Sequence, residues 1–240
     1  MSKQNKEVYQ VKKEVVTKTN LENAADTLSP ETVLSNLKLF FEKYKKQISY
    51  VGIGLILLVA AYYGYQYYLV TLNEEAEIKM LGAVSYFEKD SLDKALNGDG
   101  KNLGFKAILE DYSGTFSAEQ AKYYLGIIAL KKGQFQEGIE YLESFSKPSN
   151  NLISASAYSA IAYGYEELNE PAKAANFYEQ AARVIENNQT TPFYLVLAAE
   201  NYEVAGQNSS ALGIYKEIIK RFPNSQEKQK AERMVEKLSN

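Results

Sequence analysis

Residues 97–102, which read Asn-Gly-Asp-Gly-Lys-Asn, combine glycines with a carboxylate and an ammonium group, the residue types that bind calcium or phosphate. A calcium-binding EF-hand loop needs oxygen ligands at alternate positions and a Glu at the twelfth, and the spacing here does not supply them. A phosphate-binding P-loop needs Gly-Lys followed by Ser or Thr after a strand, whereas Asn102 follows Gly100-Lys101 and no strand precedes them. We therefore expect a turn between helices.

The absence of His and Cys from the sequence narrows the chemistry open to this chain. Ser–His and Cys–His nucleophilic catalysis is impossible, and no disulfide can form. Zinc and transition-metal sites lose their two commonest ligands. Carboxylates remain, but no spacing marks a pair for acid–base work. We expect a binding protein rather than an enzyme, with no cofactor, no metal and no small-molecule substrate.

A stretch of 23 residues without a charge, residues 48–70, precedes the rest of the chain. As a helix it rises about 34 Å, slightly more than the ~30 Å hydrocarbon core of a bilayer. Tyrosines settle at headgroup depth because their rings are apolar and their hydroxyls polar. We expect one transmembrane helix with interfacial anchors at Tyr50, Tyr62, Tyr63, Tyr65, Tyr67 and Tyr68.

Two alternatives compete with a membrane span. One is a buried helix of a globular protein. The other is a cleaved signal peptide, which has a short charged leader, a shorter apolar core and a small-residue cleavage site. Here 47 residues precede the apolar stretch, and bulky tyrosines follow Ala60-Ala61. The pattern favours an uncleaved signal anchor.

Charges on the two sides of residues 48–70 predict the orientation. Lys38, Lys43, Lys45 and Lys46 precede the stretch, whereas Glu74, Glu75 and Glu77 follow it. Lysines are retained on the cytoplasmic side, so the N-terminus should be cytoplasmic and the bulk of the chain outside. Residues 74–240 carry 18 Lys and Arg against 24 Asp and Glu, a net charge of −6. This acidic balance argues against nucleic acid as a partner.

Three features of the N-terminal part bear on its partners. Residues 1–28 are polar and are expected to be a disordered cytoplasmic tail. Residues 29–47 predict an amphipathic helix, with Ser29 as N-cap and Pro30 at the first helical position, which lies on the inner leaflet or docks onto a protein. Small residues that allow close helix packing within the span are Gly52, Gly54, Ala60 and Gly64.

From residue 119 onward the sequence repeats at intervals of 36 and 37 residues, as Gly133, Asn169 and Gly206 show. Gly and Asn leave the right-handed region cheaply, so these positions predict turns. Small residues at Gly126, Ala162 and Ala199 should let paired helices approach. The interval is close to the 34-residue period of tetratricopeptide repeats. The alternative is a helical bundle with chance periodicity.

We therefore expect an all-α fold, in which a single N-terminal transmembrane helix is followed by a tetratricopeptide-repeat-like α-solenoid. Residues 73–118 would form a degenerate first repeat, with helices over 73–96 and 103–112. Residues 119–240 would form three repeats, closed by a capping helix over 225–238 that covers the exposed apolar end of the stack.

The first helix of each repeat in such a stack faces a concave groove. By repeat register, the groove-lining residues would be Tyr123, Ile127, Lys131, Ser159, Tyr163, Glu166, Val196, Glu200 and Glu203, together with Gln120, Leu130 and Glu167. Such a groove is aromatic near its start and acidic towards its end, which suits a partner with apolar and basic patches. The alternative is that the tyrosines pack between helices and the glutamates are merely solvated.

The assembled pattern resembles a known family. Residues 37–44 (Leu-Lys-Leu-Phe-Phe-Glu-Lys-Tyr) run into the span, acidic residues follow, and Gly114-Thr115 precedes the array; the stretches 95–105 and 110–115 also carry the likeness. Over roughly residues 33–240 the chain is similar to the YfgM-like ancillary subunits of the SecYEG translocon. The cytoplasmic extension at 1–30 is longer than the tail usual in that family.

The resemblance implies a single-pass protein of the bacterial inner membrane with its repeats in the periplasm. Its partners would be SecYEG translocon subunits and periplasmic chaperones or emerging clients, and the family supplies no catalytic residues to transfer. A competing hypothesis is a scaffold of another envelope machine, in outer-membrane biogenesis or division. An envelope hydrolase or transferase is the third hypothesis.

Overall fold

The structure, a computed structural model, describes residues 30–147 and 152–239. The expected cap Ser29 and the expected disordered tail over 1–28 lie outside these residues. The chain divides into two compact units, Met1–Gln66 and Tyr67–Asn240. Within the described ranges the regular elements are all helices.

Helix α2 (Pro30–Glu88) is 59 residues long and begins at a proline. Proline suits a first helical position because the N–H that it lacks would have no partner there. No residue of the most apolar window of α2 is buried, which contradicts the alternative of a buried core helix. Among the described residues, α2 is the one helix long and apolar enough to cross a membrane, judged by length and composition. It runs without a break through the expected boundaries at 47, 70 and 73.

The first hairpin of the Tyr67–Asn240 unit differs from the expectation. Helix α2 ends at Glu88, and Asp90 takes a left-handed φ of 55°. The N–H groups of Asp90 and Ser91 donate to the carbonyls of Phe87 and Tyr86 at 3.0 and 2.9 Å. This is the Schellman ending, in which a left-handed residue satisfies the last carbonyls of a helix. One unbroken helix over 73–96 is therefore wrong, because Asp90 makes a reversal usually left to Gly or Asn.

Two short helices complete this hairpin. Helix α3 (Leu92–Asn97) follows the turn at Asp90, and helix α4 (Phe105–Asp111) follows the glycine-rich loop. Helix α4 lies within the expected range of 103–112. The ring of Phe105, which is fully buried, stacks on Tyr124 with ring centroids 4.5 Å apart, and this contact joins the first hairpin to the next.

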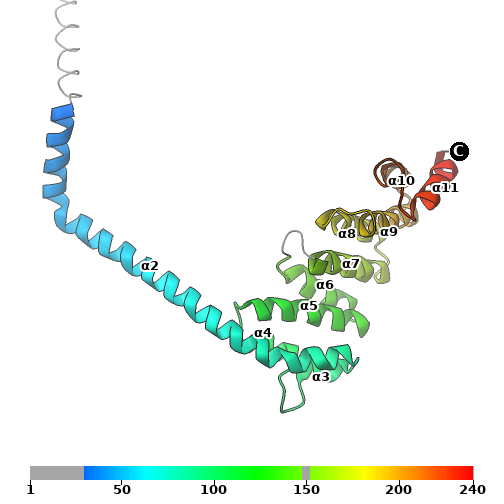
Figure 1. Ribbon diagram of the computed structural model, residues 1–240, viewed down its shortest axis with the longest axis horizontal. Helices are drawn as coiled ribbons and strands as arrows, with labels where there is room; N and C mark the ends of the chain where they lie inside the picture. The colour runs from blue at the N-terminus through cyan, green and yellow to red at the C-terminus, as the bar shows by residue number, and fades with distance from the viewer. Residues whose placement is uncertain (1–29, 148–151, 240) are drawn as a thin grey trace, which may run out of the picture. The chain divides into compact units, whose positions relative to one another are not determined.

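Three further helical hairpins follow in chain order, and neighbouring helices pack on each other (Figure 1). They pair α5 (Phe116–Lys131) with α6 (Phe135–Ser144), α7 (Leu152–Glu167) with α8 (Pro171–Val184), and α9 (Thr190–Val204) with α10 (Asn208–Arg221). Helix α11 (Lys228–Ser239) packs on α10, as expected of a capping helix, and begins three residues later than the predicted 225.

The three turns predicted within the hairpins are confirmed. Gly133, Asn169 and Gly206 have φ values of 76°, 58° and 72°. In each case the N–H of the following residue donates to the carbonyl five positions earlier, at 2.9, 2.8 and 2.8 Å respectively. These are Schellman endings of the same kind as that at Asp90, so four hairpins share one turn geometry.

Helices α5 and α6 approach each other at two glycines. A Cβ on Gly126 would lie 2.5 Å from Leu142 Cγ, and a Cβ on Gly138 would lie 2.7 Å from the side chain of Leu130. The role predicted for Gly126 is therefore confirmed. The later hairpins use alanines that have no exposed surface: Ala162, Ala174, Ala199 and Ala211.

Candidate interaction surface

The candidate interaction surface comprises the predicted groove residues of α5, α7 and α9 that keep exposed surface. On α5, Tyr123 and Ile127 are half-buried and lie one helical turn apart. Burial raises the pKa of Tyr123 above its ordinary value. Lys131 is exposed, and its Nζ lies 2.7 Å from Asp90 Oδ1, so this lysine ties α5 to the first turn.

On α7, Ser159 is half-buried and Tyr163 keeps 43% of its surface exposed. The ring of Tyr163 meets Phe135 of α6 edge-on, with centroids 6.3 Å apart. Desolvation raises the pKa of Tyr163, and the neighbouring Glu167 carboxylate adds to the effect. Tyr163 is thus an aromatic group packed on one side and open on the other.

Glu166 has its carboxylate occupied by two internal hydrogen bonds. The hydroxyl of Tyr178 donates to Oε2 at 3.1 Å, and the amide of Asn201, which is 7% exposed, donates to Oε1 at 2.6 Å. Glu166 therefore joins α8 and α9 to α7. Burial, followed by the charge and hydrogen bond of Glu166, raises the pKa of Tyr178 well above its usual range.

Helix α11 supplies the partners of the acidic residues on α9. Lys230 Nζ pairs with Glu200, and Lys237 Nζ lies 3.5 Å from Glu203 Oε2. Glu203 also accepts a hydrogen bond from the Tyr215 hydroxyl at 2.8 Å. The expected acidic end of the groove is therefore neutralised by lysines of the chain itself.

Two of the expected groove residues belong to the core. Val196 is 6% exposed and Leu130 is 5% exposed, and each lies in a cluster of buried apolar side chains. They sit on the sides of α9 and α5 that pack against neighbouring helices. Both are therefore corrected from surface to core.

Tyrosine–glutamate hydrogen bonds recur in two registers along the array. The intra-repeat pairs join the two helices of one hairpin, Tyr178 with Glu166 and Tyr215 with Glu203. The inter-repeat pairs join one hairpin to the next, Tyr165 with Glu143 at 3.4 Å and Tyr202 with Glu179 at 2.8 Å. A phenol that donates to a carboxylate makes a charge-assisted bond, which is stronger than a neutral one.

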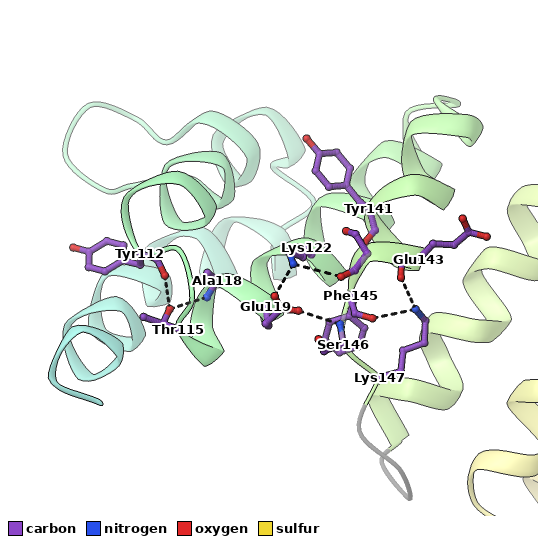
Figure 2. A network of polar contacts seen from close by, with 11 residues as sticks. Tyr112, Thr115, Ala118, Glu119, Lys122, Tyr141, Glu143, Phe145, Ser146 and Lys147 are labelled. Atoms are coloured by element: carbon purple, nitrogen blue, oxygen red, sulfur yellow. Dashed lines mark hydrogen bonds and ion pairs between the residues drawn. The ribbon is translucent and has the colours of Figure 1, made fainter. Parts of the chain in front are cut away.

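A polar network closes the α5–α6 hairpin at the start of α5 (Figure 2). Thr115 caps α5 by accepting from Ala118 N–H at 3.1 Å. Glu119 accepts from Lys122 Nζ at 2.5 Å and from Ser146 N–H at 3.0 Å, which brings the end of α6 against α5. Lys147 Nζ donates to the carbonyls of Glu143 and Phe145, and burial lowers the pKa of Lys147.

The glycine-rich loop at 97–102 is a turn, as predicted. Asp99 Oδ1 accepts from the N–H groups of Lys101 and Asn102 at 3.0 and 2.7 Å, and Oδ2 accepts from the Tyr86 hydroxyl at 2.5 Å. These bonds, that of Tyr86 first, hold the pKa of Asp99 far below its usual range. The carboxylate fastens the loop to α2.

The residues predicted to pack or anchor in the membrane lie open along α2. A Cβ added at Gly52, Gly54 or Gly64 would meet nothing within 4 Å, and Ala60 is exposed. The anchor tyrosines are between 56% and 77% exposed, namely Tyr50, Tyr62, Tyr63, Tyr65, Tyr67 and Tyr68.

The prediction missed two exposed apolar side chains on α9, Phe193 at 50% and Val204 at 75%. Phe193 lies three residues before Val196 and Val204 four residues after Glu200, so both follow the helical spacing of the predicted set. This helical spacing is the sequence signal by which the two residues could have been predicted.

The comparisons with known proteins bear on the α9–α10 hairpin. Residues 194–225, which hold most of α9, all of α10 and the turn between them, match the tetratricopeptide repeat family. No curated protein matches the chain. The two preceding hairpins share the turn geometry of the matched one. The chain is thus an all-α protein with one long apolar N-terminal helix and an array of tetratricopeptide type, a fold whose known role is to bind other proteins.

Proposed function

We propose that this protein is an adaptor of the bacterial cell envelope, anchored in the inner membrane by residues 48–70, with a cytoplasmic N-terminus and periplasmic repeats. One observation carries the proposal. Helix α2 runs without a break from the uncharged segment to Glu88, and its Ala76, Met80 and Ala83 lie in the buried cluster of the first hairpin. Lysines precede this segment and glutamates follow it, which favours a cytoplasmic N-terminus.

The proposed partners are subunits of the SecYEG translocon within the membrane and chaperones or emerging clients outside it. The YfgM-like resemblance of residues 33–240 supports this choice. The exposed side chains of α7 and α9 include the aromatic or apolar Tyr163, Phe193 and Val204, whereas Glu166, Glu200 and Glu203 already have internal partners. Apolar segments of unfolded clients therefore suit the surface better than basic ones.

Affinity purification of the full-length protein in mild detergent tests the membrane partner. We expect translocon subunits to co-purify with the wild type and with Val59→Leu, and to be lost with Gly64→Leu. Leucine at position 64 would block the close approach of a partner helix that glycine allows, whereas Val59 lies on a different face of α2. Recovery of outer-membrane assembly or division proteins in place of the translocon would support the scaffold hypothesis instead.

Protease treatment tests the orientation. In spheroplasts, protease added from outside should digest residues after Glu74 and leave the N-terminal part protected. Protection of the repeats in intact spheroplasts, with digestion only after lysis, would overturn a periplasmic location.

A further inference from the structure

The array begins to cover α2 directly after the apolar segment. Residues 55–68 are exposed, whereas Leu72 packs against the buried cluster of the first hairpin and Asn73 follows it. Asn73 Oδ1 accepts from the N–H of Ser117 at 2.9 Å and from its hydroxyl at 3.1 Å. The first turn of α5 is therefore held at the level of Asn73.

This level corresponds to the headgroup layer if residues 48–70 span the membrane. Asn73 lies three residues beyond Val70, which is about 5 Å of helix rise. Each headgroup layer is about 5–7 Å thick. The start of α5 cannot lie beside Asn73 without lying at or near this layer.

The side chain at this place is Phe116, the first residue of α5, with 56% of its surface exposed. Its backbone is fixed by the Thr115 cap (Figure 2) and by the Tyr112 hydroxyl, which donates to Glu75 Oε1 of α2 at 3.0 Å. An exposed aromatic ring on a fixed corner is well suited to the boundary between headgroups and acyl chains.

The direction of α5 places its first turn on the membrane side. Ser117 lies beside Asn73 at one end of α5, and Lys131 pairs with Asp90 at the other, so α5 runs parallel to α2. The first turn of α5 therefore faces the side from which α2 arrives. The first turns of α7 and α9 also carry exposed apolar residues, Leu152 and Phe193.

We propose that the corner between α4 and α5 is a lipid-binding edge, in which Phe116 inserts among the headgroups of the outer leaflet. The inference rests on the proposed membrane anchor. We expect this edge to bind zwitterionic rather than anionic lipid, because exposed carboxylates would repel anionic headgroups. Glu74 and Glu77 follow Asn73, which holds Ser117, and Asp111 precedes Phe116 by five residues.

Tryptophan fluorescence in vesicles tests this edge, because the sequence contains no Trp and a single one is a unique reporter. Three full-length variants are compared in phosphatidylcholine vesicles that carry a quencher on the headgroup. Phe116→Trp reports the edge, Tyr68→Trp reports the end of the span, and Val204→Trp is a matched exposed position at the C-terminal end of α9. We expect quenching at 116 to approach that at 68 and to exceed that at 204 several-fold.

The outcomes separate the edge from the anchor. Strong quenching at 68 with quenching at 116 no greater than at 204 would overturn the edge and leave the anchor standing. Weak quenching at all three positions, with extraction of the protein by carbonate, would overturn both. Asn73→Ala in the Phe116→Trp background should lower the quenching at 116, because it releases α5 from α2; an unchanged value would contradict the role given to Asn73.

Discussion

Tyr215 donates its hydroxyl proton to Glu203 Oε1 across 2.8 Å, and the tyrosine has no exposed surface. Its own helix, α10, is thereby bonded to α9. Because Lys237 of α11 lies on the other oxygen of the same carboxylate, Glu203 connects three helices. The buried phenol and the carboxylate hold the C-terminal end of the array together.

Removal of this hydroxyl should destabilise the array. We expect Tyr215→Phe to lower the free energy of unfolding by about 1–2 kcal/mol, because it leaves Oε1 of the partly buried Glu203 carboxylate without its donor while keeping the ring. Urea unfolding of the detergent-solubilised protein, followed by helical circular dichroism, measures the change. The matched control is Tyr158→Phe, because the ring of Tyr158 contacts Phe177 and Lys147 and phenylalanine keeps that ring. Equal effects of the two substitutions would contradict the assignment.

Stability should fall at alkaline pH. Burial first, and the hydrogen bond to Glu179 second, raise the pKa of Tyr202 from 10.0 to about 12. The unfolded chain loses this proton near pH 10 while the folded chain retains it, so folding stability decreases as pH rises from 10 towards 12. Urea midpoints measured across this interval should fall, and less steeply for Tyr202→Phe. A midpoint independent of pH there would exclude buried phenols as contributors.

The two glycines at the α5–α6 contact should not tolerate a methyl group. Gly126→Ala would place a Cβ 2.5 Å from Leu142 Cγ and 3.0 Å from a backbone oxygen, so we expect a loss of about 1–3 kcal/mol. The control is Gly213→Ala in α10, where a Cβ meets nothing within 4 Å. That change should stabilise the helix by about 0.5–1 kcal/mol. Denaturant midpoints of the two variants measure these changes, and we expect the midpoint to fall for Gly126→Ala and to rise for Gly213→Ala.

The turn at Asn169 should depend on its left-handed conformation. Asn169→Ala forces a Cβ-bearing residue without a compensating side-chain amide into a φ of 58°, so we expect a loss of about 1 kcal/mol. Asn169→Gly should be neutral or slightly stabilising. Thermal unfolding of the two variants provides the comparison, and a greater loss with Gly than with Ala would show that backbone strain does not govern this turn.

The hairpin array was predictable because its landmarks are constraints on the backbone. Gly133, Asn169 and Gly206 mark reversals that few residues can make, and their spacing gives the repeat directly. The first hairpin was harder because Asp90 makes the same reversal. Aspartate is common on helix surfaces, so its type alone does not indicate a left-handed turn.

The surface was less predictable than the fold. The repeat register predicted that Glu166 and Glu203 lie on the open side of their helices. In the structure their carboxylate oxygens accept hydrogen bonds from tyrosines twelve residues later, on the second helix of the hairpin. The pairing becomes visible only once the hairpin closes, although the Glu and the Tyr both recur at a distance of 37 residues. Val196 was misplaced because a helix packed between two neighbours has more than one buried side.

The α7–α8 hairpin takes part in both registers of tyrosine–glutamate bonds and has bonding partners at both of its borders. The α7–α8 hairpin carries Tyr165 for the glutamate before it and Glu179 for the tyrosine after it, besides its own pair, Glu166 with Tyr178. A tandem duplication of residues 152–188 would therefore carry a tyrosine for the preceding unit and a glutamate for the following one. Genes encoding such arrays can lengthen by whole units, without compensating changes at the junctions.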